Sequence, residues 1–411
     1  MIPFPLFRQV PLTAVLLLLI AYFLSPLFTY SFGPGGFNDQ RVLQLLWLSA
    51  CLVTLLFAAE YRRWLIEWMQ RFSKLTMVCL VLFFAAVTVS ALLAPNTLRA
   101  LQEVGLYASL LLAMAAVARE LSKLDKDELA VLLTFALTIF CVVYAIYFLI
   151  YYFAVFLPEP ERFNESRIWM PNFYNHRSFN QVEVWLLPAF FWLCHRARLY
   201  SPGRAAMVYL LTSVWWAMLF YSLGRGISLA MVVAMLGVAL LFRRQALALL
   251  KPALVTLVLG LLFYWLMFLL PKYLYFDELS FRYADRFQEL HAGGRMPLWQ
   301  FAWDSFLNNP VFGLGPQHYA YFYERHSHAH NVTLNSLAEL GVAGTVPLLA
   351  LALIAAWSII RGAIAAPSPL SILLVFCLLA VAVYSQFTAQ FYFPAAQLVL
   401  ILFAGVAIIC T

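Results

Sequence analysis

The residues that could do chemistry are gathered in a few short segments, and the densest is His326-Ser-His328-Ala-His330-Asn331. Three histidines at spacing two could bind a metal from one side of an extended strand. A zinc site usually adds a ligand at another spacing, and none is evident here. A neutral imidazole could instead act as a general base that takes a proton from a hydroxyl group. A structural histidine held in a loop is the third interpretation.

The sequence after the histidines bears on the general base. Leu334, Leu337 and Leu340 recur at helical spacing, so we predict a helix that starts near Asn331. The positive end of that helix would lie beside His330, which disfavours the imidazolium and keeps the ring available as a base. His330 is therefore the predicted catalytic residue, with His328 and Asn331 as further candidates.

Arg225 stands between Gly224 and Gly226 in the segment SLGRG, in a very short turn between two apolar runs. An arginine near membrane depth is costly unless it faces a cavity or a counter-anion. The flanking glycines would let a phosphate approach the backbone closely. The alternative is an interfacial arginine that extends toward lipid headgroups.

Arg295 follows two glycines and precedes a segment that we predict to be helical. Pro297 fits the first turn of a helix, and Asn308-Asn309-Pro310 would end it. The apolar face of this segment is too short to span a membrane, so we predict an interfacial helix on the outer leaflet. Arg295 at its head would lie where backbone N–H groups favour an anion. The alternative is a solvated arginine in a flexible loop.

The segment 175–181 places His176 and Arg177 directly before an apolar run. Polar residues so near the end of a span indicate a lined cavity, although a solvated loop would give the same pattern. Glu103 and Glu183, at predicted outer ends of spans, could neutralise the arginines.

The elements that must position these segments follow from composition. Of the 411 residues, 64% are hydrophobic and 11% are charged, with a net charge of +7. A soluble protein averages about half apolar and about a quarter charged. A soluble enzyme, a secreted disulfide scaffold and a nucleic-acid-binding protein are therefore excluded as classes. The six cysteines lie in or beside apolar runs, so we interpret them as small core residues.

Apolar runs of roughly 20 residues predict membrane spans. We predict an all-α, polytopic membrane helix bundle of about twelve spans that forms a single membrane domain over residues 1–411. The spans are 11–30, 42–59, 76–94, 100–118, 129–157, 181–195, 205–222, 226–242, 252–270, 340–360, 369–387 and 393–410. Two long outer loops, 158–180 and 271–339, separate them, and the second lies between the ninth and tenth spans.

The basic residues predict the orientation. With both termini in the cytoplasm, the cytoplasmic segments hold 15 of the 26 lysines and arginines, as the positive-inside rule requires. The other 11 lie outside, most of them in the two long loops and the turn at Arg225. Six of the seven histidines are on the same side. Most of the anion-binding and titratable chemistry is therefore expected at the outer face.

Taken together, these motifs resemble the O-antigen ligase and polymerase superfamily. The resemblance rests on SLGRG at 222–226, GGRMPLW at 293–299, NPVFGLG at 309–315, HSHAHN at 326–331 and LAELGVAG at 337–344. It extends over the whole twelve-span layout with its large outer loop. The segment FYNHRSFNQ at 173–181 favours the ligase branch.

The resemblance implies a glycosyltransferase of the bacterial inner membrane that works at the periplasmic face. Such an enzyme moves O-antigen polysaccharide from undecaprenyl diphosphate to a sugar of lipid A–core, which completes lipopolysaccharide. The family reaction uses no metal and no nucleotide cofactor. By position in the motifs, Arg225 and Arg295 match the family's arginines and His330 its histidine. Arg177 is a further candidate for the diphosphate. The extra His326 leaves open which imidazole is the base.

Chemistry gives independent support, because the periplasm offers no ATP and the donor must arrive already activated. A diphosphate leaving group supplies that activation, and guanidinium groups suit its oxygens. Two alternatives remain. A polymerase of the same superfamily would leave its product on the lipid diphosphate. A transporter or flippase of the lipid-linked glycan would place ionisable groups near the midplane and show inverted halves, whereas here they crowd the outer rim.

Overall fold

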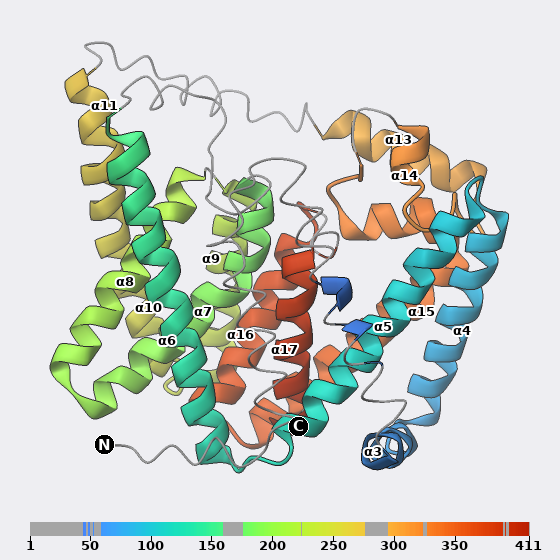
Figure 1. Cartoon of the computed structure of the whole chain (residues 1–411), viewed down its shortest axis with the longest axis horizontal. Helices are drawn as coiled ribbons and strands as arrows, with labels where there is room; N and C mark the ends of the chain where they lie inside the picture. The colour runs from blue at the N-terminus through green and yellow to red at the C-terminus, as the bar shows by residue number, and fades with distance from the viewer. Residues whose placement is uncertain are drawn as a thin grey trace.

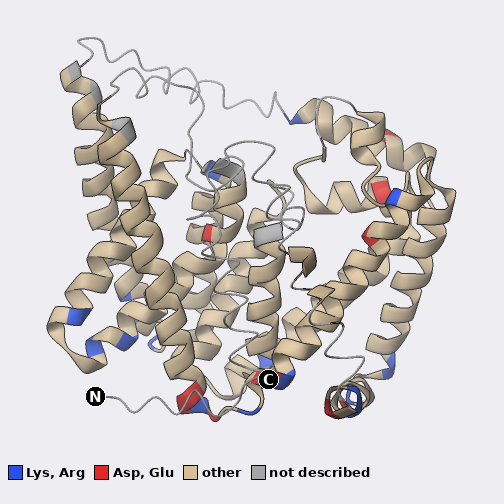
Figure 2. Ribbon diagram, in the orientation of Figure 1, with Lys and Arg blue, Asp and Glu red and all other residues tan. Residues whose placement is uncertain are grey.

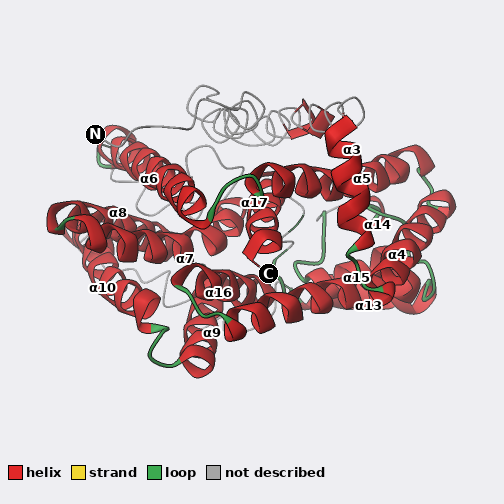
Figure 3. Cartoon of the chain, turned by 90° about the horizontal axis from the view of Figure 1, so that it is seen from below, coloured by secondary structure: helices red, strands yellow, loops and turns green. Residues whose placement is uncertain are grey.

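The computed structural model describes residues 44–46, 48–49, 52, 59–158, 176–222, 224–275, 295–323, 327–388, 391 and 394–410. Within these ranges the chain is helical and has no strand, as predicted (Figure 3). The predicted span 11–30 and most of the predicted span 42–59 lie outside the described residues.

Each of the other predicted spans corresponds to a helix. These helices are α4 (Lys74–Leu93), α5 (Thr97–Leu121), α6 (Lys126–Tyr151) continued by η2 (Tyr152–Phe156), α7 (His176–Tyr200), α8 (Pro202–Tyr221), α9 (Arg225–Phe242), α10 (Leu247–Tyr264) continued by η4 (Trp265–Leu269) and α11 (Leu270–Tyr275), α15 (Val332–Ala365), α16 (Pro369–Tyr384) and α17 (Pro394–Cys410). Seven helices in the described ranges are long and apolar enough to cross a membrane, and two shorter ones are apolar. The chain is thus a multi-pass membrane protein, and the full number of twelve spans stays a prediction.

Large apolar side chains face outward from the long helices. Leu240 of α9, Val258 of α10 and Leu353 of α15 are 80%, 65% and 70% exposed. A soluble protein does not expose apolar surface on this scale, whereas a bilayer solvates it.

Helix α7 is enclosed by other helices, and it forms the centre of the main core. It contacts α6, α8, α9, α10, α16 and α17. Phe190 and Phe191 lie against Trp215 and Trp216 of α8, with ring centroids 4.9 and 5.9 Å apart. The first half of α7 also buries polar side chains, namely Ser178, Asn180, Gln181 and Glu183. These polar groups lie at the end of the bundle that carries α13, and we call this end the upper end (Figure 1).

The helices form two groups in Figure 1. The α7 group contains α6, α7, α8, α9, α10 and α16. The α15 group contains α4, α5 and α15, with α13 (Met296–Asn308) and α14 (Tyr319–Phe322) covering its upper end. Helix α17 contacts both α5 and α7 and so lies between the groups.

Helix α15 is interrupted at Gly341, whose φ of 59° and ψ of −167° are not helical. A short helix therefore runs from Val332 to the break, and the predicted span of 340–360 follows it. The predicted helix start near Asn331 is confirmed. The short helix belongs to the same continuous element as the span, which fixes its position relative to the bundle.

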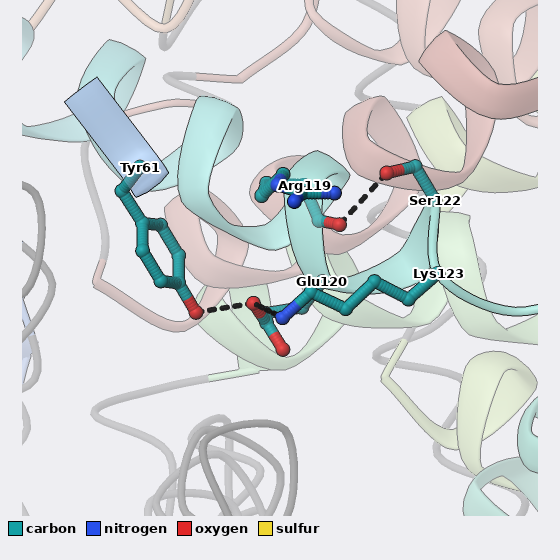
Figure 4. A network of polar contacts seen from close by, with 5 residues as sticks. All are labelled: Tyr61, Arg119, Glu120, Ser122 and Lys123. Atoms are coloured by element: carbon teal, nitrogen blue, oxygen red, sulfur yellow. Dashed lines mark hydrogen bonds and ion pairs between the residues drawn. The ribbon is translucent and has the colours of Figure 1, made fainter. Parts of the chain in front are cut away.

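Residues 59–70 form a helix that sequence analysis missed, because this segment was interpreted as a basic loop. Helix α3 (Ala59–Gln70) lies across the lower end and is seen end-on in Figure 1. The buried Glu120 of α5 accepts a hydrogen bond from the Tyr61 hydroxyl (Figure 4). It also forms an ion pair with Lys123, whose Nζ lies 2.6 Å from Glu120 Oε1. This contact anchors α3 to the bundle.

Basic residues gather at the lower end (Figure 2). The helix bounds place there Arg119 and Lys123 at the end of α5, Arg198 at the end of α7, and Arg243 at the end of α9. Far fewer basic residues mark the upper end of the described chain. The bundle is therefore electrostatically asymmetric along the helix axes.

Candidate functional site

The tract that contains His330 is held in one conformation by hydrogen bonds. Asn331 caps α15, since its Oδ1 accepts a hydrogen bond from the N–H of Leu334 at 2.9 Å. The N–H of Ala329 donates to Asn335 Oδ1 at 3.0 Å. His330 itself has a φ of 54°, in the left-handed region that non-glycine residues rarely occupy. Such strain persists only where neighbouring contacts impose it, and it is common at functional sites.

His328 and His330 lie against each other, with ring centroids 4.2 Å apart and planes at 69°. Both rings are about 6% exposed. Ser327 Oγ is 2.7 Å from His328 Nδ1, so the His328 ring has a polar partner next to it. No three His, Cys, Asp or Glu side chains gather as metal ligands within the described ranges. His326 lies outside the described residues, as do Gly293 and Gly294.

Four residues after α16 lie at the starts of α7, α9, α13 and α15, and sequence analysis did not select them. We call this segment, Ser385-Gln386-Phe387-Thr388, the connector. Ser385 O accepts a hydrogen bond from the N–H of Val332 at 2.9 Å. Gln386 O accepts one from Asn331 Nδ2 at 3.2 Å. The connector therefore binds directly to the start of α15, next to His330.

Phe387 of the connector lies beside Arg295 and beside Gly226, the residue that follows Arg225. The guanidinium carbon of Arg295 is 6.0 Å from the centroid of the Phe387 ring, which is cation–π distance. A Cβ added to Gly226 would lie 3.0 Å from Phe387 Cβ, so the ring packs against the residue next to Arg225. The turn at Arg225 and the start of α13 thus meet at one aromatic ring.

The glycines around Arg225 make room for protein rather than for a ligand. A Cβ at Gly224 would lie 2.7 Å from Asn180 Nδ2 and 2.5 Å from Ile227 Cγ2. Ser222 Oγ also donates a hydrogen bond to Asn180 Oδ1 at 3.0 Å. Both glycines therefore permit tight packing, and the close approach of a phosphate to their backbone stays a prediction. Arg225 itself is exposed at the first turn of α9, where no described side chain caps the helix.

The start of α7 reaches the same connector. Gln181 Nε2 donates to Thr388 Oγ1 at 3.1 Å, and both residues are buried. His176 and Arg177 lie in the first turn of α7, but their side chains lie outside the described set. Glu183 is fully buried further along α7, and Glu103 is partly exposed on α5.

A backbone contact between two glycine motifs holds the short helix of α15 in place. Gly313, with φ 69°, lies against the backbone of Glu339, and Gly341 lies against that of Val311. The N–H groups of Leu314 and Gly315 donate to the carbonyls of Ala338 and Glu339 at 2.9 Å each. The motifs NPVFGLG and LAELGVAG are thus two halves of one structural clamp.

Helix α13 is fastened to this clamp through Tyr319. Burial and the neighbouring Tyr323 raise the pKa of the Tyr319 hydroxyl, so it stays protonated and donates to Leu298 O at 2.9 Å. Leu298 and Ala302 are buried, whereas Trp303 is 47% exposed. Helix α13 was predicted to lie on the outer leaflet, and one of its faces in fact packs on α15.

His318 is a structural histidine. Its Nε2 accepts a hydrogen bond from the N–H of Asn96 at 3.2 Å, so Nδ1 carries the proton and donates to Pro316 O at 2.8 Å. The ring is 1% exposed. His318 joins the α4–α5 turn to the loop that precedes α14.

The connector was hard to find from sequence. Its signal was a set of polar residues, Ser385, Gln386 and Thr388, at the end of the predicted span 369–387. The partners of Gln386 are Thr333 and Asn331, which lie 53 and 55 positions away in the sequence. The partner of Thr388 is Gln181, which lies 207 positions away. The resulting arrangement combines two arginines, the starts of four helices and a buried histidine. Such a set can bind an anion and accept a proton.

Comparison with known proteins identifies the segment that contains this arrangement. Residues 204–349 match a family model described as O-Antigen ligase. The matched segment runs from α8 into α15, and so includes Arg225, Arg295 and His330. No curated protein matches the chain. The segment 204–349 of this multi-pass membrane protein is therefore similar to the O-antigen ligase family.

Proposed function

We propose that this protein is an O-antigen ligase of the bacterial inner membrane. It transfers polysaccharide from undecaprenyl diphosphate to a sugar of lipid A–core at the periplasmic face. The observation that carries the proposal is the connector, because Phe387 and Gln386 bring the Arg225 turn, Arg295 and the His330 tract to one place. A cationic surface beside a buried imidazole suits an anionic leaving group and a hydroxyl acceptor.

The chemical step is a single displacement at the anomeric carbon of the donor sugar. His330 takes the proton of the acceptor hydroxyl, and the resulting oxygen forms the new glycosidic bond. The bond between the anomeric carbon and the diphosphate oxygen breaks, and its electron pair leaves with undecaprenyl diphosphate. The attack occurs opposite the leaving group, so the anomeric configuration inverts.

The arginines stabilise the charge that develops on the diphosphate. Arg225 lies in the first turn of α9, where the helix dipole adds to its charge, and Arg295 lies at the start of α13. Arg177 in the first turn of α7 is the third candidate. Removing one group that stabilises developing charge typically costs about 3 kcal/mol, or about a hundredfold in rate.

The lower-end basic residues support an orientation in which both termini are cytoplasmic and the connector faces the periplasm. Cytoplasmic ends of spans carry the excess of lysine and arginine. In this orientation the candidate site meets lipid-linked glycan after it has crossed the membrane. No nucleotide is available at the periplasmic face, so the donor sugar is activated by the diphosphate that it carries.

The test is reconstitution of the purified full chain with undecaprenyl-diphosphate-linked glycan and lipid A–core in vesicles. Mass spectrometry of the products should find glycan attached to lipid A–core. Longer glycan on the polyprenyl carrier would replace the ligase with a polymerase. Glycan moved across the vesicle bilayer without a covalent change would identify a transporter.

Variants connect the activity to the site. His330→Ala should remove at least 99% of the transfer while the protein elutes as a folded species, whereas His318→Ala should retain transfer per folded molecule. Normal transfer by His330→Ala would refute the assignment of the base.

A chelator tests whether the reaction needs a metal. Transfer that persists in the chelator supports a reaction without metal. Loss of transfer that a divalent cation restores would refute the metal-free reaction. Proton NMR of the new linkage checks inversion.

A further inference from the structure

A cationic cavity lies at the lower end, away from the connector. It has a volume of about 530 Å³, is open to the surface, and is lined by the end of α7, the α9–α10 turn, the start of α10 and the link between α15 and α16. Cavities of a few hundred to about 1,000 Å³ are the usual size for small ligands. None of the motifs described above takes part in it. It therefore needs its own explanation.

The lining of this cavity is positively charged. Arg198 of α7, Arg244 of the α9–α10 turn and Lys251 of α10 line it together with His195, and no acidic residue does. Within the described ranges, the ion pair found is the one between Lys123 and Glu120, and neither residue lines this cavity. Three like charges around one cavity repel one another, so an anion placed between them lowers the free energy of the bundle.

The start of α16 faces the same cavity. Ser368, Pro369 and Ile372 are among the lining residues. The capping box already uses the N–H groups of Ser368 and Ser371, and Pro369 has none to offer. The helix start thus contributes the favourable field of its dipole, while direct contacts to an anion would come from the guanidinium and ammonium groups.

Apolar side chains border the cations. Leu199 and Leu247 line the cavity and are 66% and 44% exposed, and the neighbouring Tyr200 is 55% exposed. A free phosphate would gain nothing from such a border. A ligand with an anionic head and hydrocarbon chains would cover the apolar surface and neutralise the cations at once.

We propose that this lower cavity binds the phosphate headgroup of an anionic phospholipid from the leaflet at the lower end. Arg198, Arg244 and Lys251 hold the phosphate, and Leu199 and Leu247 contact the start of its acyl chains. The bound lipid would screen the repulsion between elements that are far apart in sequence, namely α7, α10 and the start of α16. The proposal is independent of the transferase activity.

The test compares lipid retention by the full chain and two double variants. Purified protein in detergent is titrated with phosphatidylglycerol, and bound lipid is counted by native mass spectrometry. Arg198→Gln with Arg244→Gln removes two lining cations. The matched control is Arg204→Gln with Arg361→Gln, because both residues are exposed and outside the cavity lining.

We expect the lining variant to bind phosphatidylglycerol about 30-fold more weakly, since each removed cation costs about 1 kcal/mol against an anionic headgroup. The control should bind like the parent and keep its melting temperature without lipid. The lining variant should melt no lower than the parent without lipid, because it loses repulsion between the cations. Equal binding by all three proteins would overturn the proposal. So would equal retention of phosphatidylcholine, or displacement of the lipid by inorganic phosphate at matched concentration.

Discussion

The Arg295 guanidinium lies over the ring of Phe387, 6.0 Å from its centroid. The same side chain packs against Gly226, so Phe387 contacts both the α13 start and the α9 start. Two cations that bind one diphosphate, as proposed here, need a fixed spacing. Phe387 is placed to supply that spacing.

Replacing Phe387 with Leu should weaken donor binding. The substitution removes a cation–π contact of about 0.5–2 kcal/mol and loosens the packing at Gly226, so the KM for the lipid-linked donor should rise about 2- to 30-fold. Phe387→Tyr keeps the ring and should behave like the parent. The measurement is transfer rate against donor concentration in vesicles. An unchanged KM for Phe387→Leu would show that the ring does not position Arg295.

Gly341→Ala should destabilise the protein strongly. The residue has a positive φ, and an added Cβ would lie 2.3 Å from Val311 O. Strain and overpacking together cost about 2–5 kcal/mol, so the melting temperature in detergent should fall by several degrees. Gly105→Ala is the matched control, because it lies in α5 with nothing within 4 Å of its added Cβ. That control should be neutral or stabilise by up to about 1 kcal/mol. Equal melting temperatures for the two variants would contradict the clamp.

His318→Ala should lower stability without acting on chemistry. The substitution leaves the Asn96 N–H and the Pro316 carbonyl without their ring partner, a loss of about 1–3 kcal/mol each when buried. The measurement is a thermal unfolding curve together with transfer per folded molecule. A folded protein with a specific loss of transfer would instead make His318 part of the site.

Asn331 has two separable roles, and two substitutions divide them. Asn331→Ala removes the cap of α15 and should cost about 1 kcal/mol of stability. Asn331→Asp keeps an oxygen for the Leu334 N–H but loses the donor to Gln386 O. The aspartate variant should therefore keep its melting temperature yet lose transfer, because its charge opposes a diphosphate. Full activity of Asn331→Asp would show that the connector contact is dispensable.

Local signals predicted the elements of the candidate site well. An asparagine followed by leucines at helical spacing was enough to predict the start of α15. Proline after Arg295 and the Asn308-Asn309-Pro310 stop predicted α13, whose bounds are confirmed. These features depend on residues a few positions apart, which sequence patterns report directly.

Contacts between distant elements could not be read in the same way. Gln386 contacts Asn331 because the end of α16 reaches the start of α15, which no local pattern specifies. Helix α3 was missed because its mean hydropathy is low, although Trp64 and Trp68 stack at helical spacing. The span 181–195 was predicted within α7, whereas the buried Ser178 and Asn180 were placed in the outer loop 158–180. The enclosure of α7 by six other helices was not predicted.

Helix α17 touches α5 on one side and α7 on the other, so it works as a spacer between the two helix groups. His330 belongs to the α15 group and Arg225 to the α7 group. In the proposed mechanism, the base and one diphosphate-binding arginine are thus carried by different halves of the bundle. A shift of one half against the other by about 1 Å would then slow transfer about a hundredfold. The rate of transfer should therefore depend on how rigidly α17 and the direct contact between α15 and α16 hold the two halves together.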